Sequence, residues 1–344
     1  MAEVASSTDP KNPPRVVFLI GAPRSGTTWL QTLLGSHDDV VTPQETDLFS
    51  TLVAPLQNWW DEQLGRSLGD QERRRAKGLA AVLDDAEFSG LMSGVIGGVF
   101  DAISALDPTA SVIVEKSPSH SQHVNLIAKY MPTAQFVHIV RDGRDVVTSL
   151  QAASQGWGNH WAPSAPKRGA LMWQRNVQAA LTAAATDRYI EIKYEDLRAG
   201  DPEPLQGAFA SCGLDVDRAQ CASLLDEYSL TRMAEGAASS PIAVGGTLSE
   251  LSSDRNEPQG FFGKGATGGS TASWSSRERL LFDAIAGDLL IQLGYEVDHA
   301  WAGSSRARAM FAKRAAAARL MGRIGRRLGS RLTKRSERLL AKFP

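Results

Sequence analysis

The apolar residues of this chain follow two different periods. Four short runs are rich in β-branched and aromatic residues and stop at a polar residue, a glycine or a proline, which is typical of buried strands. These predicted strands are residues 15–20, 111–118, 134–142 and 188–197. The segments between them place apolar residues at helical spacing, so strands and helices alternate. This order predicts an α/β fold in which helices cover both faces of a central parallel sheet.

The helical pattern also outlines the domain organisation. The predicted helical segments are residues 26–37, 48–106, 145–154 and a helix that starts at a Ser275/Glu278 capping box and closes at Gly294. Residues 234–275 are rich in Gly, Ser, Ala and Thr with weak periodicity, which predicts a flexible lid. We therefore expect a disordered lead-in at 1–14, one domain at 15–300 and a separate tail at 301–344.

Composition is ordinary for a globular protein, with 42% hydrophobic and 22% charged residues among 344. The two cysteines, Cys212 and Cys221, lack metal-ligand spacing, and we expect inert thiols in a reducing compartment. No apolar run approaches the roughly 20 residues that a membrane span needs. The first residues hold no hydrophobic core of a secretory signal. These features together predict a cytoplasmic protein.

The formal net charge of −1 hides a strongly basic C-terminus. Residues 301–344 hold 13 Lys and Arg against one acidic residue, a net +12, so the other 300 residues carry −13. An apolar stripe within the tail consists of Met321, Ile324, Leu328 and Leu332. This pattern predicts an amphipathic helix on an anionic membrane surface, with a solvated and partly disordered tail as an equal alternative. No aromatic platform accompanies the charge, so nucleic-acid binding is not expected.

The first candidate binding site is the loop after the first predicted strand, in the stretch GAPRSGTTW at residues 21–29. Its glycines have the spacing of a nucleotide phosphate-binding loop, but Thr27 stands where that loop has its lysine. A loop between a strand and a helix presents unpaired backbone N–H groups and the positive end of the helix dipole. Arg24 adds a charge suited to phosphate or sulfate oxygens, and Ser25, Thr27 and Thr28 add hydroxyl groups. The loop is therefore predicted to hold an anion, with a plain glycine turn or a degenerate NTPase as alternatives.

A second candidate site follows the third predicted strand, in the stretch RDGRDVVTS at residues 141–149. The strand end places Arg141 at the rim of the sheet, and the following turn and helix can bring the Ser149 hydroxyl beside it. Two such donors suit a terminal phosphate. The alternative is an exposed ion-pair cluster of Arg141, Asp142, Arg144 and Asp145.

These two motifs, in this order, resemble those of sulfotransferases that use 3′-phosphoadenosine 5′-phosphosulfate (PAPS). The resemblance covers roughly residues 15–297 and implies a P-loop-like sulfotransferase fold, PAPS as co-substrate and no metal. It assigns the 5′-phosphosulfate to Arg24, Ser25, Gly26, Thr27, Thr28 and Trp29, and the 3′-phosphate to Arg141 and Ser149. It also brings Tyr194 near the nucleotide. In the stretch from 263, only Lys264 and Gly265 match the family's Arg-Lys-Gly, because Gly263 replaces the arginine.

Sulfuryl transfer needs a base for the acceptor hydroxyl and a cation for the leaving phosphate oxygen. Glu45 is the favoured base, because a glutamate in a similar context serves in the tyrosylprotein branch of the family. His120 is the rival base, since a histidine serves in the cytosolic branch. Lys116, supported by Arg24, is the candidate for the leaving group, and pairing of Lys116 with Glu115 is its structural alternative. The six histidines form no ligand cluster, so no metal is expected.

The acceptor is predicted only by class. Aromatic side chains that border the cleft would suit a carbohydrate, a glycolipid or another small molecule as acceptor. For each such side chain, the alternative is plain packing in the core. The aromatic and histidine residues expected at the cleft are Trp59, Trp60, Trp157, His160 and Trp161. Two other functions compete with the sulfotransferase. A P-loop kinase or NTPase would need the missing loop lysine, and a non-catalytic anion-binding module on a membrane would leave Arg141 and Ser149 without a role.

Overall fold

A computed structural model describes residues 13–69, 78–236, 240–243, 257–258, 260–262, 265, 267–268 and 271–313. The chain divides into two compact units, residues 1–270 and 271–344. The first unit holds the sheet and both candidate anion sites. Most of the predicted lid, Lys264 and the tail from residue 314 lie outside the described residues.

The sheet of the first unit is entirely parallel, as the alternation of strands and helices predicted. Its strands are β1 (Arg15–Ile20), β2 (Val40–Pro43), β3 (Val112–Glu115), β4 (Gln135–Val140), β5 (Tyr189–Lys193) and the two-residue β6 (Ile242–Ala243). They lie in the order β5-β4-β1-β3-β2-β6. From β1 the chain first forms β2 and β3 on one side and then β4 and β5 on the other, and β6 later pairs with β2. Such a reversal of strand order opens a crevice at the carboxyl ends of the strands.

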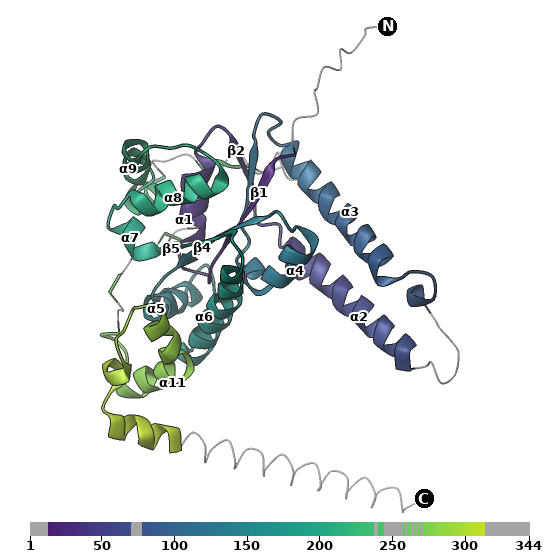
Figure 1. The fold of residues 1–344 in the computed structure, drawn as a ribbon. Coiled ribbons are helices and arrows are strands. Elements are labelled where there is room, and N and C mark those ends of the chain that lie inside the picture. Colours follow the sequence, from purple (N-terminus) through teal and green to yellow (C-terminus); the bar gives the residue numbers. More distant parts are fainter. Residues whose placement is uncertain are drawn as a thin grey trace, which may run out of the picture. The chain divides into compact units, whose positions relative to one another are not determined.

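Alternating side chains of β1 pack into two separate cores, one on each face of the sheet. Val17 and Leu19 belong to a core with the helices after β1 and β5, whereas Phe18 and Ile20 belong to a core with the helices after β2 and β3. The period of two therefore buries both faces of the strand. The expected α/β fold with helices on both faces is confirmed, and Figure 1 shows the two helical layers around the sheet.

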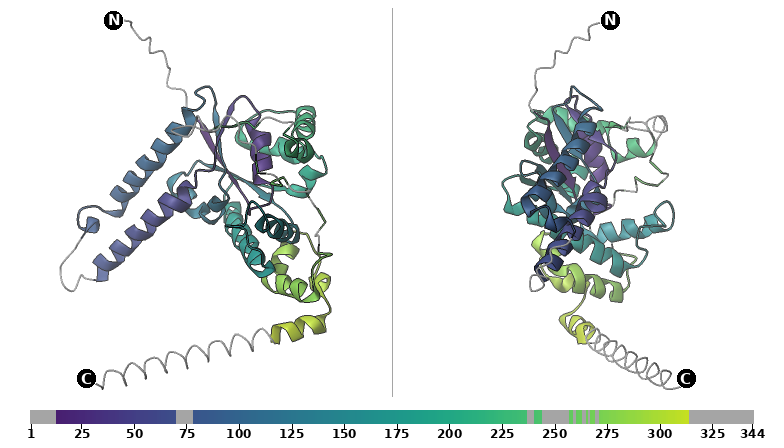
Figure 2. Two further views of the ribbon diagram at one scale, coloured as in Figure 1. Left: turned by 180° about the vertical axis from the view of Figure 1, so that it is seen from behind. Right: turned by 90° about the vertical axis from the view of Figure 1, so that its right-hand side faces the viewer.

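The helices of the first unit connect successive strands. They are α1 (Thr27–Gly35), α2 (Ala54–Gly69), α3 (Asp85–Ser104), α4 (Val124–Tyr130), α5 (Gly143–Ser154), α6 (Pro166–Ala180), α7 (Tyr194–Arg198), α8 (Glu203–Cys212), α9 (Arg218–Glu227) and α10 (Leu230–Ala234). Short 3-10 turns lie at Leu79–Ala81, Pro118–Gln122 and Leu181–Ala185, and a π-helical turn lies at Phe49–Val53. Helices α2 and α3 form a pair that extends from one face of the sheet (Figure 2).

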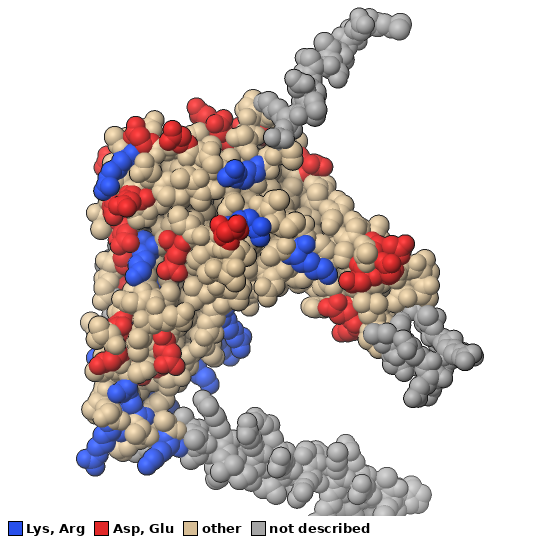
Figure 3. Space-filling view, in the orientation of Figure 1, with Lys and Arg blue, Asp and Glu red and all other residues tan. Residues whose placement is uncertain are grey.

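Helix α3 is long and apolar, although acidic residues interrupt its apolar run. With 20 residues and a mean hydropathy of 1.2, it is long and apolar enough to cross a membrane by length and composition alone. One of its faces packs into the core through Phe88, Met92 and Ile96. The acidic residues Asp84, Asp85 and Glu87 surround its capped N-terminus. Figure 3 shows acidic side chains gathered over this end of the α2–α3 pair.

The last predicted strand is shorter than expected. Residues 194–197 form helix α7 and do not continue β5. The register explains this end, because Lys193 pairs with Val140, the last residue of β4, and none of the described strands lies beside the chain further on. Consequently Tyr194 lies directly at the carboxyl edge of the sheet.

The second unit contains helix α11 (Ser276–Gln292) and a 3-10 turn at His299–Ala302. The predicted capping box is present: Ser275 accepts from the N–H of Glu278, whose carboxylate accepts from the N–H of Ser275. Gly294 follows the helix with a left-handed φ of 76°. The sequence therefore predicted both ends of this helix.

Candidate active site

Each of the five main strands is followed at its carboxyl end by a residue that the sequence singled out. Arg24 lies in the loop after β1, Glu45 comes two residues after β2, and Lys116, Arg141 and Tyr194 directly follow β3, β4 and β5. Because the strands are parallel, these ends meet at one edge of the sheet. Residues far apart in the sequence thus converge on one site.

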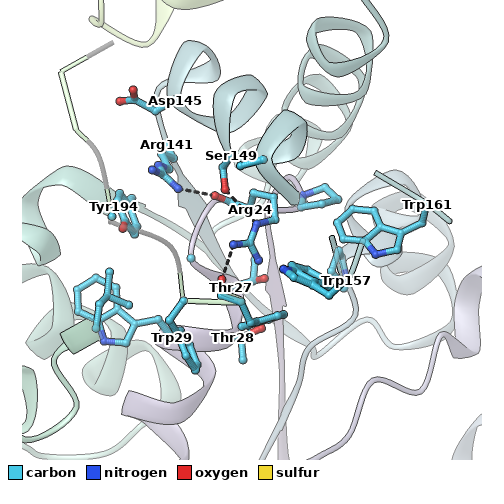
Figure 4. Close-up of a pocket in the computed structure, with 18 of the residues that line it drawn as sticks. Arg24, Thr27, Thr28, Trp29, Arg141, Asp145, Ser149, Trp157, Trp161 and Tyr194 are labelled. Atoms are coloured by element: carbon cyan, nitrogen blue, oxygen red, sulfur yellow. Dashed lines mark hydrogen bonds between the residues drawn. The ribbon is translucent and has the colours of Figure 1, made fainter. Parts of the chain in front are cut away.

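A cavity of about 1070 Å³ opens at this edge. The predicted site residues that line it are Arg24, Gly26, Thr27, Thr28, Trp29, Glu45, Arg141, Ser149, Tyr194 and Gly265. Figure 4 shows Arg24 between Trp157 on one side and Trp29 and Tyr194 on the other. The two candidate anion sites therefore belong to one cavity.

The loop after β1 brings its backbone close to the cavity. Gly26 has a left-handed φ of 94°, and a Cβ atom there would lie 2.6 Å from the ring of Tyr194, so only glycine fits. Arg24 also has a positive φ, of 72°. Ser25 is buried, and its hydroxyl has no hydrogen-bond partner among the described residues. No described side chain caps the N-terminus of α1. The loop thus offers unused donors of the kind that bind anions.

The Arg24 side chain links the two anion motifs. Its Nε donates to Ser149 Oγ at 3.1 Å and its NH2 group to the carbonyl oxygen of Phe261 at 2.5 Å. The guanidinium lies 5.1 Å from the ring centre of Trp157 and 5.0 Å from that of Phe261. Burial, followed by the nearby positive charge of Arg141, lowers the pKa of Arg24 to about 10. An anion bound beside both arginines would relieve this repulsion.

The second motif forms a buried structure. Arg141 donates to the backbone oxygen of Arg24 at 2.8 Å, and its guanidinium lies 4.4 Å from the ring centre of Tyr194. Asp142 caps α5 by accepting from the N–H of Arg144, and it also binds the Arg144 guanidinium at 2.6 Å. Arg141, Asp142, Arg144 and Asp145 are all buried, in contrast to the alternative of an exposed ion-pair cluster.

Glu45 and Lys116 meet at the wall of the cavity. The Lys116 ammonium contacts the Glu45 carboxylate and lies 3.4 Å from the Thr28 hydroxyl in the first turn of α1. Lys116 is only 2% exposed, whereas the side chain of Glu45 is 42% exposed. Lys116 therefore pairs with Glu45 and not with its neighbour Glu115. The candidate base and the candidate leaving-group cation are joined at the edge of the anion loop.

His120 lies in a different environment. It is buried, with Nδ1 at 2.5 Å from a carboxylate oxygen of Glu115 and Nε2 accepting from the backbone N–H of Phe49 at 3.3 Å. The rings of Phe18 and Phe49 each lie 5.5 Å from the imidazole. An imidazole nitrogen that accepts a hydrogen bond carries no proton, so the proton lies on Nδ1. Neither nitrogen is directed into the cavity lining, which does not include His120 among the described residues.

The five candidate acceptor residues divide into two groups. Trp157, His160 and Trp161 line the cavity. Trp60 is buried in the core, where it stacks on Phe88 at 4.4 Å between ring centres, and Trp59 is 39% exposed on α2 outside the cavity lining. Trp60 is therefore a core residue, as the alternative of plain packing predicted. The aromatic residues that do border the cavity come from the segment after α5.

Several lining residues were not singled out in the sequence. Asp47, whose φ of 49° is left-handed, borders the cavity, and its carboxylate accepts from Ser119 at 2.6 Å. Phe261 and Phe262 come from the segment predicted as a lid. In the sequence, the only feature that could have indicated a role for these two phenylalanines was their position as an aromatic pair in a polar segment. Gly265 has a φ of 59° and lies against Tyr194, while Lys264 falls outside the described residues.

Two further properties of the described residues bear on the chemistry. They contain no group of three or more His, Cys, Asp or Glu side chains placed to hold a metal ion. Both cysteines are free and buried, and burial raises the pKa of each thiol.

Comparison with known proteins agrees with this geometry. A model of the sulfotransferase family matches residues 14–218, which is more than half of the chain. The chain is 27% identical over 184 residues to protein-tyrosine sulfotransferase 1 of Danio rerio, covering 53% of this chain and 48% of that protein. It is 29% identical over 140 residues to the Rattus norvegicus protein of the same name, covering 41% of this chain and 34% of that protein. It thus spans about half or less of these curated relatives.

Among solved structures, a mouse sulfotransferase complexed with PAP superimposes with a TM-score of 0.50. The alignment covers 80% of this chain and 84% of that one at 15% identity, so the likeness concerns the fold. The family expected from the two anion motifs is confirmed by the family model. This chain belongs to the sulfotransferase family.

Proposed function

We propose that this protein transfers a sulfuryl group from PAPS to an acceptor hydroxyl. The observation that carries the proposal is the convergence in one cavity of Arg24, Arg141, Ser149 and Glu45, with the buried Lys116 behind the lining in contact with Glu45. Two cationic groups suit a donor with anions at both ends. A carboxylate and an ammonium group suit proton removal and leaving-group stabilisation between those ends.

The residues present fit the donor. The unpartnered Ser25 hydroxyl and the first turn of α1 would bind the 5′-phosphosulfate, and Arg141 with Ser149 would bind the 3′-phosphate. Trp29 and Tyr194, whose rings lie 5.8 Å apart, border the same cavity and offer a surface for a flat base. Ser149 Oγ accepts from Arg24 Nε, so its own O–H can still donate to the 3′-phosphate.

The expected chemistry is an in-line displacement at sulfur. The acceptor oxygen attacks sulfur while the bond between sulfur and the 5′-phosphate oxygen breaks. The acceptor proton passes to Glu45, and the electron pair of the broken bond leaves on the phosphate oxygen, whose charge Lys116 offsets. Glu45 is favoured over His120 because the Nε2 lone pair of His120 is engaged by the N–H of Phe49.

The acceptor side of the cavity favours a hydroxyl on a flat or apolar body. The rings of Trp157 and Trp161 lie 5.6 Å apart, Trp157 lies beside Arg24, and His160 borders the same cavity. Aromatic faces of this kind bind phenols and sugars. The names of the curated relatives add the tyrosine hydroxyl of a peptide to the acceptors worth testing.

The test is transfer of radioactive sulfate from labelled PAPS to a tyrosine-containing peptide, to 4-nitrophenol and to a glucoside, with hydrolysis of PAPS as the reaction with water. We expect transfer to at least one acceptor above the hydrolysis rate. Binding of PAP without transfer or hydrolysis would favour a non-catalytic anion-binding protein. Phosphate transfer from ATP and magnesium would favour a kinase, although Thr27 replaces the lysine which that reaction needs.

For the tail we propose association with an anionic membrane surface. Its net charge of +12 over residues 301–344 and its apolar stripe support this partner. Full-length protein should sediment with vesicles containing phosphatidylserine, and protein lacking residues 306–344 should not. Equal sedimentation of both proteins would contradict the proposal.

A further inference from the structure

Glu115 is a buried ionisable group that the proposed chemistry does not use. It ends β3, directly before Lys116, and it is not exposed. Burial raises the pKa of its carboxyl, but hydrogen bonds from His120, Thr46 and Ser117 outweigh burial and leave the pKa below its usual value. The carboxylate is therefore ionised at neutral pH, and a buried charge of this kind persists only where partners stabilise it.

The partners of Glu115 all lie around the loop that carries Glu45. One carboxylate oxygen accepts from Thr46 Oγ1 at 2.7 Å, from Ser117 Oγ at 2.9 Å and from the N–H of Thr46 at 3.4 Å. Ser117 Oγ in turn accepts from the N–H of Asp47 at 3.0 Å. The other carboxylate oxygen binds His120, which anchors the N–H of Phe49. Residues 46, 47 and 49 are thus tied to one strand end.

This arrangement defines the position of Glu45 from both sides. Lys116 contacts the Glu45 carboxylate, while Glu115, its neighbour along the chain, binds the backbone and side chain of Thr46. The left-handed backbone of Asp47, a conformation that Asp adopts more readily than most residues other than glycine, lies within the same network. The conformation of the loop that carries Glu45 therefore depends on the hydrogen bonds that Glu115 accepts.

We propose that Glu115 and His120 are positioning residues that, through Thr46, hold Glu45 against Lys116 at the edge of the anion loop. This inference rests on the proposed function, in which Glu45 removes the acceptor proton. His120 thereby gains a role that does not require it to touch a substrate. Displacing a base by about 1 Å reduces turnover up to about 10²-fold, so loss of this network should affect the rate more than donor binding.

The direct change, Glu115→Gln, removes a buried charge and can unfold the protein, so Thr46→Val is the more informative variant. It keeps the shape of the side chain and removes the hydroxyl that Glu115 accepts from. We expect turnover, measured with 4-nitrophenol as acceptor and by PAPS hydrolysis, to fall about tenfold with PAP affinity nearly unchanged. The melting temperature should fall by a few degrees, because the buried carboxylate loses one hydrogen bond. Thr46→Ser should restore the rate, and Thr182→Val on the exposed surface should have no effect.

A double-mutant cycle separates positioning from general damage. If Thr46 acts through Glu45, then Thr46→Val adds no further loss to Glu45→Gln, because the group being positioned is already absent. Unchanged turnover in Thr46→Val alone, or additive losses in the double variant, would overturn this inference while leaving the proposed function intact. Full turnover in Glu45→Gln would instead overturn the proposed base, and the positioning role with it.

Discussion

The two halves of the cavity are built in different ways. The donor half, at the ends of β1, β4 and β5, is cationic and carries Arg24 and Arg141 on short contiguous motifs. The acceptor half, at the ends of β2 and β3, is formed around carboxylates, with Glu45 facing the cavity and Glu115 beneath it. Arginines repel one another in the first half, whereas in the second each carboxylate has a cation or hydrogen-bond donors.

This difference assigns different tasks to the halves. Two neighbouring cations provide affinity for an anionic donor, because a bound anion relieves the repulsion between Arg24 and Arg141. A compensated network gives little affinity, but it holds a base and a cation at fixed positions. Variants of the donor half should therefore weaken binding, and variants of the acceptor half should slow the reaction.

The largest effect is expected for Lys116→Met, which preserves much of the volume of the side chain but removes the cation beside the leaving oxygen. Turnover should fall about 10²- to 10³-fold. The measurement is the rate at saturating PAPS, compared with PAP affinity by calorimetry. A loss of less than about threefold would remove Lys116 from the reaction.

Glu45→Gln should follow, with turnover about 10²-fold lower and PAP affinity little changed, because the amide cannot accept the acceptor proton. His120→Ala serves as the comparison and should lower the melting temperature, since it removes a buried ring that contacts Phe18 and Phe49. If His120→Ala abolished turnover at an unchanged melting temperature, and Glu45→Gln did not, then the base would be His120.

Arg141→Ala should weaken PAP binding about 10- to 100-fold, the effect of losing charged hydrogen bonds to a phosphate. The affinity for AMP, which lacks the 3′-phosphate, should change far less. Arg218→Ala, at a residue that is 63% exposed on α9, is the matched control and should bind PAP normally. Equal weakening for PAP and AMP would place Arg141 elsewhere on the nucleotide.

The smallest effect is expected for Ser149→Ala. A neutral hydroxyl contributes about 1 kcal/mol to binding, so PAP affinity should fall about fivefold, with turnover at saturation unchanged. Calorimetric titration of the variant with PAP measures the change. Tighter binding would mean that the contact between Ser149 and Arg24 competes with the ligand more than the hydroxyl assists it.

The donor half could be predicted from the sequence because its information is local. The residues of GAPRSGTTW are neighbours along the chain, and the strand-to-helix geometry fixes where their donors point. The proximity of Arg141 and Ser149 could be predicted because it depends only on the end of one strand and the helix that follows it. The bounds of β1 and the Ser275 capping box were likewise set by adjacent residues. Such features follow from local periodicity and capping.

The acceptor half could be predicted only in part, because its contacts join distant segments. Glu45 lies 71 positions from Lys116, and Thr46 lies 69 positions from Glu115. Nothing in the local pattern distinguishes the buried Glu115 from an exposed glutamate, or the packed Trp60 from a lining tryptophan such as Trp157. These outcomes depend on which side chains the sheet brings together. Phe261 reaches the site from a segment without periodicity.

The most direct test of the central claim is calorimetric binding of PAP, compared with AMP and with ATP plus magnesium. The proposed site requires both anions, so PAP should bind at least about tenfold more tightly than AMP, and ATP with magnesium should bind weakly. Equal affinity for PAP and AMP would show that Arg141 and Ser149 do not hold a 3′-phosphate. That result would contradict the use of PAPS by this cavity.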